Sequence, residues 1–548
     1  MNSKGRKFLR RKVSLIVIAS ASVMLILTSF ARSNNNPNAE SIPPGGMAAC
    51  VIQNSKSRPV LNNSDPVAKL LLASGRCPIN VFEFRSQLLA AGGKIKTALV
   101  ANRGFHNPKF GSFSMFEMVS GSLAPLGITV DDGELFFGHF TAPKGASTLF
   151  ANQQPGLDDL MIELIAWDPG KQVFNFYEMI GDGKQGNWFY RGDSLDIQSD
   201  VKLLHRQPGL GKPRFGTNLR CSGCHTAGGP ILKELAPPHN DWWSKQRLLD
   251  FGNLKPDAEL SRIFQGLVEA DELSNNVKAS VAKLFGSAKF QQAQKALSLQ
   301  EQLRPLFCPV ELNLESDSTP LDQKASKIQI PSAFFVDSML AQSSILIERS
   351  HYDAALSALK ASFPETLLAD ADHGWLTPVK AFSDTLAIDF LIKQGLIDKE
   401  FAIDVLAVDI TNPVFSAARR SLLRLLPDSA EGDWKEKFKA ALRANAGKNP
   451  AANELLSNLN DPSRNMQFHQ ARALRFLDQC QKRLQEKSAV IEAYQLLAQR
   501  RAEAFDSEIS KNPKGEILEP GFRVIFPQVK PAAKPGVLRF GEDGRVIR

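Results

Sequence analysis

Most of the short motifs that mark a familiar chemistry are missing from this chain of 548 residues. There is no Walker A phosphate-binding motif and no G-x-S-x-G, and the glycines in GLGKPRFG have the wrong spacing for a dinucleotide fingerprint. The chain has one C-x-x-C, no second one, and no H-x-x-x-H. A structural zinc site of the usual four close ligands is therefore not expected.

Long apolar runs are also scarce, and the one that stands out covers residues 13–31 without a single charge. Six basic residues and no acidic one lie in the first twelve positions. A basic start followed by an apolar run is an export signal. This run is also nearly long enough to span a bilayer, which takes roughly 20 residues. We therefore expect the rest of the chain to be periplasmic, either soluble after cleavage at residue 31 or anchored in the inner membrane through residues 13–31.

The positive charge of the chain is concentrated in the same segment. The formal net charge is +9, and the six basic residues of the first twelve leave only about +3 for the exported part. A strongly basic protein is often a nucleic-acid binder, but an exported part this close to neutral gives no reason to expect a nucleic-acid partner.

Cysteine is rare, with six residues in the chain, and two of them fall in the stretch LRCSGCHTAGGP. Cys221 and Cys224 are followed directly by His225. In an exported chain the C-x-x-C-H pattern is typical of covalent haem attachment. Two thiolates at this spacing can form thioethers with the haem vinyl groups, and the adjacent imidazole can ligate the iron. A redox dithiol and a structural disulfide or metal site are the rival interpretations, although the Gly- and Pro-rich flanks do not fit a thioredoxin-like strand and helix.

Over residues 214–243 the chain resembles the c-type cytochromes, as a member with one haem. The resemblance implies that Cys221 and Cys224 carry one haem c and that His225 is the proximal iron ligand and so the metal-binding residue. It also implies that a proline carbonyl about a dozen residues downstream accepts the imidazole N–H, and Pro237 has that position, although Pro237-Pro238 can equally be a rigid loop.

The second axial ligand departs from the pattern of that family, because no methionine occurs between His225 and Met339. The candidates for the distal position are His239 and His205, which are near the motif in sequence. Met179 and His139 are weaker candidates on expected strands. A five-coordinate iron with an open face is the remaining alternative, and axial ligation decides whether a haem only passes electrons or also binds a small molecule.

The pattern along the chain predicts an α+β protein. Short aromatic runs such as GELFFGHF, QVFNFYEMI and NWFYRGD predict an antiparallel sheet, with a hairpin loop at residues 181–186 and a short helix near VFEFRSQLLAA. Apolar residues at helical spacing then predict a mostly α-helical C-terminal domain packed on the haem region. The expected division is: signal peptide or anchor 1–31, flexible leader 32–77, α+β domain 78–205, haem c segment 206–243, helical domain 244–505, extended or loosely docked tail 506–548.

The four remaining cysteines are Cys50, Cys77, Cys308 and Cys480. Sequence cannot choose between their three connectivities, but Cys50 with Cys77 is favoured because both lie at the boundary between the leader and the α+β domain. Cys308 and Cys480 either pair or remain buried thiols. Cys480 and Met466 belong to an apolar helical stripe after Asp461-Pro462, so both are expected in the core rather than at a metal.

Three classes of function follow from these observations. The first is periplasmic electron transfer through one haem, which implies a redox partner protein. The second is a haem enzyme or small-molecule sensor with an open distal face, since strands followed by C-x-x-C-H is similar to the order of elements in cytochrome P460-type proteins. The third is an exported scaffold without haem, in which CSGC is a disulfide. No catalytic residue can be assigned from the sequence.

Overall fold

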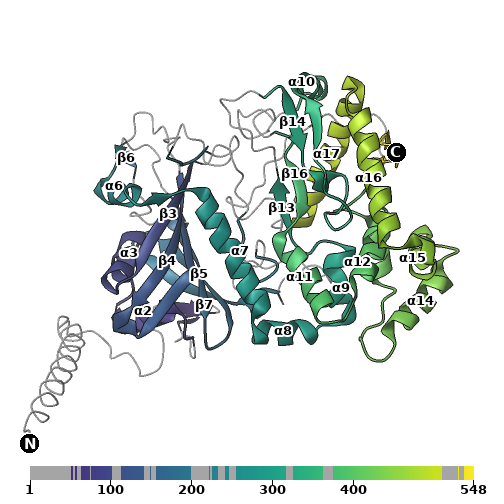
Figure 1. The fold of residues 1–548 in the computed structure, drawn as a ribbon. Helices are drawn as coiled ribbons and strands as arrows, with labels where there is room; N and C mark the ends of the chain where they lie inside the picture. Colours follow the sequence, from purple (N-terminus) through teal and green to yellow (C-terminus); the bar gives the residue numbers. More distant parts are fainter. Residues whose placement is uncertain are drawn as a thin grey trace, which may run out of the picture.

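The computed structural model describes the protein over most of its length after residue 50. The described residues are 51–53, 56–57, 63–74, 76–101, 113–140, 148–149, 156–198, 221, 225–232, 241–245, 255–315, 325–361, 374–508, 529 and 536–548. They form two halves that lie side by side, a sheet half and a helical half, with α7 (Ala270–Gly286) between them (Figure 1). The predicted α+β class is confirmed.

The sheet half is built on one ten-stranded sheet with the strand order β10-β3-β4-β5-β7-β8-β9-β1-β2, in which β12 also pairs with β3. Neighbouring strands along the centre are antiparallel, as predicted, and β1 and β12 add parallel pairs at the edges. The predicted hairpin is confirmed, with Gly181 opposite Gly186. The strands are β1 (Val51–Gln53), β2 (Lys56–Ser57), β3 (Lys94–Ala101), β4 (Phe113–Leu123), β5 (Ile128–Phe140), β7 (Leu157–Asp168), β8 (Val173–Asp182), β9 (Gly186–Asp193), β10 (Asp241–Trp242) and β12 (Leu267–Val268).

The sheet is covered on both faces, which explains why its central strands are apolar almost throughout. In β8 every residue except the last is buried. Tyr177 and Met179 pack on one face with α2 (Pro66–Ser74) and α3 (Val81–Ala90), and α3 is the short helix that the sequence predicted. Phe174 and Phe176 pack on the other face. The alternation of a strand therefore sends consecutive aromatic residues into two separate cores.

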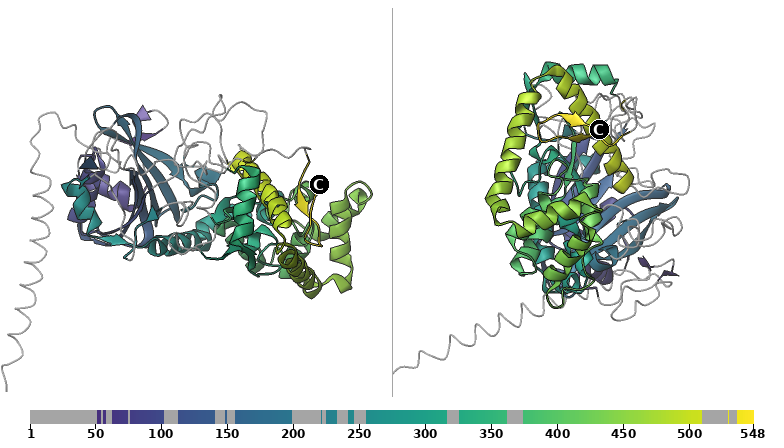
Figure 2. Two further views of the ribbon diagram at one scale, coloured as in Figure 1. Left: turned by 90° about the horizontal axis from the view of Figure 1, so that it is seen from above. Right: turned by 90° about the vertical axis from the view of Figure 1, so that its right-hand side faces the viewer.

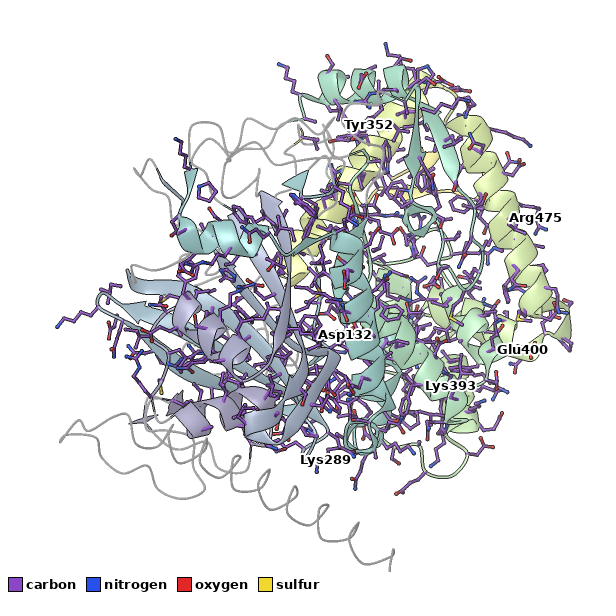
Figure 3. The ribbon with its side chains drawn as sticks, turned by 60° about the vertical axis from the view of Figure 1, so that its left-hand side comes forward. Asp132, Lys289, Tyr352, Lys393, Glu400 and Arg475 are labelled. Atoms are coloured by element: carbon purple, nitrogen blue, oxygen red, sulfur yellow. The ribbon has the colours of Figure 1, made fainter. Side chains whose placement is uncertain are left out.

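The helix α7 (Ala270–Gly286) covers the second face of the sheet. Ser280 Oγ donates to the Gly133 carbonyl at 2.6 Å, and Lys283 pairs with Glu134. Asp132, on the adjoining part of β5, lies beside α7 in Figure 3. The predicted apolar stripe of this helix is confirmed, but it packs on the sheet. In the structure α7 therefore belongs with the sheet half, and the helical half begins after it. The sequence had predicted that the helical domain begins at residue 244.

The start of the domain also differs from the prediction, which assigned residues 32–77 to a flexible leader. Val51 and the α2 residues Val67, Ala68 and Leu71 are buried in the core of the sheet half. Asp65 begins α2, because its Oδ1 accepts the backbone N–H groups of Val67 and Ala68. The leader prediction is wrong from residue 51 onward in the described residues, and the missed signal was Asp65-Pro66, a cap followed by proline in the first turn.

The helical half surrounds a large apolar core that includes Phe334, Tyr352, Trp375 and Tyr494. Tyr352, labelled in Figure 3, is on α10 and contacts the α17 residue Tyr494. Three small antiparallel ribbons complete this half: β13 (Leu312–Glu315) with β16 (Thr377–Lys380), β14 (Lys327–Ile330) with β15 (Ile345–Glu348), and β17 (Arg539–Phe540) with β18 (Val546–Ile547). Its principal helices are α9 (Leu299–Phe307), α10 (Arg349–Leu359), α11 (Phe382–Lys393), α12 (Lys399–Leu406), α13 (Ala417–Leu423), α14 (Trp434–Asn445), α15 (Pro450–Asn460), α16 (Met466–Arg483) and α17 (Lys487–Glu508).

The C-terminal tail is docked on this core through Leu538 and Phe540, while most of residues 541–548 are exposed. Phe540 is 2% exposed, and its carbonyl accepts the Thr411 hydroxyl at 2.9 Å. The expectation of an extended or loosely docked tail is therefore wrong for residues 536–548. The prolines and glycines of the tail dominated the prediction, whereas one aromatic side chain and the turn at Gly544, with φ +77°, dock the hairpin.

The cysteines outside the motif are partly as predicted. Cys308 and Cys480 are thiols, and burial raises the pKa of both. Cys480 lies in the apolar core with Ala473 and Leu477, as the stripe predicted. Cys77 forms a disulfide whose partner lies outside the described residues, so its pairing with Cys50 stays a prediction.

None of the helices in the described part of the chain combines the length and the apolar composition needed to cross a membrane. Residues 1–31, on which the signal or anchor prediction depends, lie outside that part.

Candidate haem attachment site

The described part of the C-x-x-C-H motif lies on the α7 face of the sheet, where the two halves meet. Cys221 packs against the apolar cluster of Phe174, Phe176 and Ile197. The His225 ring lies 5.3 Å from the Phe176 ring, centroid to centroid. Cys224, His205, His239 and Pro237 lie outside the described residues, so the predicted distal ligands and the predicted proline contact stay predictions.

The backbone brings Cys221 and His225 onto one turn. The His225 N–H donates to the Cys221 carbonyl at 2.9 Å, which is the hydrogen bond of an α-helical turn. The Gly228 N–H then donates to the His225 carbonyl at 2.7 Å and reverses the chain. Gly228 has φ +76°, and a Cβ there would lie 2.5 Å from the Ser194 carbonyl oxygen, so only glycine fits.

The imidazole of His225 is oriented by a backbone carbonyl. Its Nδ1 lies 2.9 Å from the Gly229 oxygen. Because a carbonyl oxygen only accepts, Nδ1 carries the proton and donates it, and Nε2 of the neutral ring is then the nitrogen with a lone pair. A metal-binding histidine commonly has this arrangement, in which the second nitrogen donates to a carbonyl and fixes the tautomer. The resemblance implied Pro237 as one candidate acceptor, and Pro237 lies outside the described residues; within them the Gly229 carbonyl accepts this N–H.

A cavity lies between this turn and the sheet, bounded by Cys221, His225, residues 230–232 and the α7 residues Leu273 and Val277. Its floor comes from four neighbouring strands. One row of side chains runs Phe116, Gly138, Glu163, Glu178 from β4 to β8, in register. The row beside it runs Met118, Phe136, Ile165, Phe176. Gly138 has no side chain, so the floor is open at that position.

At its polar end the floor has two glutamates, and an arginine balances the charge of one of them. Glu163 and Glu178 are directly opposite each other on β7 and β8. Arg191 Nε donates to Glu178 Oε2 at 2.5 Å, and both side chains are more than nine-tenths buried. Because an uncompensated buried carboxylate is strongly unfavourable, the arginine permits an acidic group beside an otherwise aromatic cavity.

These surroundings supply part of what a c-type haem needs, although the cavity, at about 100 Å³, is smaller than the roughly 300–1,000 Å³ of small-molecule sites. A porphyrin needs apolar and aromatic walls, one imidazole nitrogen directed at the iron, and thiols for its vinyl groups. The described residues supply the aromatic floor, the oriented His225 and the Cys221 thiol. The described residues contain no cluster of three or more His, Cys, Asp or Glu side chains that could hold a bare metal ion. A haem iron needs no such cluster, because the porphyrin supplies four of its ligands.

The two weaker candidates for the distal ligand lie on the far side of the sheet. Met179 is buried in the core with α2 and α3. His139 is fully buried, stacks on Phe137, and its Nε2 lies 2.9 Å from Glu117 Oε1. The structure therefore does not bring either side chain together with His225. Both residues were placed on strands correctly, but the sequence could not tell which face of the sheet would carry the motif.

The turn after His225 is also tied to the helical half. Gln198 Nε2 donates to the Ala227 carbonyl at 3.1 Å, and Gln294 Nε2 donates to Gln198 Oε1 at 2.8 Å. On β13, Asn313 Nδ2 donates to the Leu232 carbonyl at 3.3 Å. The candidate site is thus held between two halves that lie side by side in the left view of Figure 2.

Sequence reasoning missed the residues that shape the site rather than those that define the motif. Phe176 and Gly138 were inside predicted strands, and the alternation of side chains along each strand gave the face of each residue relative to its neighbours. Nothing local distinguished the Gly229 carbonyl, because any backbone carbonyl can accept. No family model matches the chain, and neither a curated protein nor a solved structure matches it.

Proposed function

We propose that this chain is a periplasmic c-type haem protein that carries one haem c on Cys221 and Cys224, with His225 as the proximal iron ligand. The observation that carries the proposal is the hydrogen bond from His225 Nδ1 to the Gly229 carbonyl at 2.9 Å, within the C-x-x-C-H motif. It leaves Nε2 as the ligating nitrogen and holds the ring in place. When bound, the haem supplies an iron centre that can gain or lose one electron.

Electron transfer to a redox partner protein is the function that we propose first. The residues of this chain then hold the haem rather than react with it. The Nδ1–H of His225 donates to the Gly229 carbonyl oxygen. Phe176 and the strand residues exclude water from one side of the His225 ring. A dry, aromatic surrounding favours electron transfer because little solvent must reorganise when the charge of the iron changes.

The cavity over Gly138 favours a second function, a haem enzyme or small-molecule sensor. An open position in the floor next to Phe116 and Glu163 leaves room for a small molecule. The two functions differ in the sixth iron ligand, which is filled in a pure electron carrier and open in an enzyme or sensor. The scaffold without haem is favoured least, because a disulfide scaffold gives no role to the oriented imidazole of His225.

The experiment that tests haem binding is expression of the full chain in cells that mature c-type cytochromes, followed by haem staining of the denatured protein. We expect covalent haem in the natural chain and none in Cys221→Ala/Cys224→Ala. Cys308→Ala is the matched control, because it removes a thiol outside the motif and should leave the stain unchanged. Full retention of the stain in the double variant contradicts the proposal.

The absorption spectrum of the same protein separates the two functions. It is recorded oxidised, reduced, and reduced with carbon monoxide. A low-spin reduced spectrum that carbon monoxide does not change indicates two filled axial positions and electron transfer. A high-spin spectrum that shifts with carbon monoxide indicates an open iron and the enzyme or sensor function.

A further inference from the structure

A second and larger cleft lies between the two halves, separate from the cavity at His225. It has a volume of about 840 Å³, within the range of roughly 300–1,000 Å³ that small-molecule sites occupy. One wall is α7, and the other is formed by β13, β14 and the start of α11. Figure 1 shows α7 on one side of the junction and β13 and α11 on the other.

The base of this cleft is the segment that follows His225. Residues 230–232 and Val277 line both the cleft and the cavity at the haem site. Asn313, on the opposite wall, holds the segment through its hydrogen bond to the Leu232 carbonyl. A molecule bound in the cleft would therefore be separated from the candidate haem site only by residues 230–232.

The lining of the cleft consists mainly of neutral hydrogen-bonding side chains. Hydroxyl groups come from both walls, for example Ser274 on α7 and Ser332 and Ser344 opposite. Amides come from Asn313 and Gln329, and Gln329 Nε2 donates to Ser344 Oγ at 2.9 Å. Such groups donate and accept, so they suit a ligand with many hydroxyl groups better than one with a single strong charge.

The charged groups of the cleft are one lysine, Lys278, and three carboxylates, Asp271, Glu311 and Glu315. Glu311 is 4% exposed and accepts the Ser383 hydroxyl at 2.7 Å, so it is withdrawn from the cleft. Lys278, Asp271 and Glu315 are exposed. The excess of carboxylates makes the cleft unsuited to an anion, and one lysine against two exposed carboxylates leaves too little net charge to hold a polycation.

One aromatic ring is exposed at the rim. Phe382, the first residue of α11, lines the cleft and is 41% exposed, although an exposed phenyl ring is unfavourable in water. An exposed aromatic face beside hydroxyl, amide and carboxylate groups matches a pyranose ring, which has apolar C–H faces and a rim of hydroxyl groups.

We propose that this cleft binds a short, uncharged oligosaccharide, with one sugar ring against Phe382 and its hydroxyl groups on the serine and amide side chains of the two walls. This proposal does not rest on the presence of haem. The carboxylates Asp271 and Glu315 act as additional acceptors for hydroxyl groups, since a carboxylate accepts two hydrogen bonds at each oxygen.

Isothermal titration calorimetry of the full chain tests the proposal. The probes are maltotriose, cellotriose and chitotriose as uncharged sugars, spermine as a cation and citrate as an anion. We expect saturable binding of at least one trisaccharide and none of spermine or citrate. No binding of any trisaccharide overturns the proposal, and so does binding of spermine or citrate alone.

Variants locate the bound sugar. Phe382→Ala should weaken the binding at least tenfold, and Gln329→Ala should weaken it severalfold. Phe468→Ala is the matched control, because Phe468 is 38% exposed at the start of α16 and outside the cleft. Its affinity should equal that of the natural chain. Equal binding by the Phe382 and Phe468 variants overturns the proposed position. Circular dichroism checks that each variant is folded.

Discussion

The two faces of the large sheet are made by the same strands but are packed differently. On the face that meets α2 and α3, one large apolar cluster extends over the strands from β1 to β4, and a small cluster around Leu99 and Met115 continues it at the β3 end. On the face that meets α7 and the C-x-x-C-H motif, the buried residues form two smaller clusters. A cavity opens on this second face, beside His225.

The polar groups of the two faces differ in the same way. On the α2 and α3 face, Glu117 is fully buried and accepts hydrogen bonds from Thr97, Arg85 and the His139 ring. On the α7 face, Glu163 lies at the edge of the cavity. A closed face stabilises the fold, whereas an open face can accept a ligand at the expense of packing. The difference indicates that the α2 and α3 face stabilises the fold, whereas the α7 face has the cavity that can accept a ligand.

The largest expected effect is on the closed face. Phe84 on α3 is fully buried and contacts Phe137 and Trp188 at centroid distances of 5.2 and 5.1 Å. Phe84→Ala should lower the free energy of unfolding by about 3–5 kcal/mol, because it leaves a cavity in a tight core. Urea unfolding followed by tryptophan fluorescence measures this loss.

The matched control is Leu89→Ala, on the same helix. Leu89 is 47% exposed, so the change should stay within about 0.5 kcal/mol. A loss below about 1 kcal/mol for Phe84→Ala would show that the α2 and α3 face is loosely packed, and the contrast between the two faces would disappear.

An intermediate effect is expected from the buried carboxylate of the closed face. Burial by itself raises the pKa of Glu117, but the hydrogen bond and charge of His139, with Arg85 and Thr97, outweigh it and lower the pKa below the ordinary 4.5. Glu117 therefore contributes stability that is complete above pH 4.5 and is lost as the pH falls through its lower folded value. Glu117→Gln should cost about 1–3 kcal/mol at pH 7 and remove this part of the acid dependence.

Urea unfolding at pH 7 and at a series of lower values checks this prediction. Glu436→Gln is the control, since the Glu436 side chain is 61% exposed on α14 and should change the stability by less than about 0.5 kcal/mol. If the Glu117 variant keeps the full decline in stability toward low pH, the hydrogen bonds to Glu117 do not stabilise the charged form.

The smallest effect on stability is expected on the open face. A Cβ at Gly138 would lie 3.5 Å from the Phe116 ring, which is an ordinary contact, so Gly138→Ala should change the stability by less than about 1 kcal/mol. It should nevertheless alter the absorption spectrum of the matured haem protein, because the methyl group enters the cavity beside His225.

Gly286→Ala is the matched control, because a Cβ there meets no atom within 4 Å and lies at the end of α7. Its spectrum should equal that of the natural chain. Identical spectra for both variants would mean that the space over Gly138 is not part of the haem site, and the distinction between an open and a closed face would lose its functional meaning.

Much of the local structure followed from the sequence because its causes are local. The aromatic runs of β5, β8 and β9 alternate with glycine turns, and the α7 stripe repeats at helical spacing, so strands and helix were predictable. The spacing of Cys221, Cys224 and His225 in the C-x-x-C-H motif likewise predicts haem attachment from a local pattern. The leader and the tail were mispredicted because Gly, Pro and Asn content was weighed above single buried residues such as Leu71 and Phe540.

By itself the sequence determined the class of the fold and the alternation that gives each strand two faces, and it predicted Cys221, Cys224 and His225 as attachment residues. Only the tertiary structure decided which face lies beside the motif, since a strand presents both faces equally until α2, α3 and α7 cover them. It placed Met179 and His139 away from His225 and put the Gly229 carbonyl on its ring. The positions of Met179 and His139 depend on packing between groups far apart in the sequence. The Gly229 contact is local, but it depends on the turn at Gly228, whose close approach to the Ser194 carbonyl only the folded chain provides.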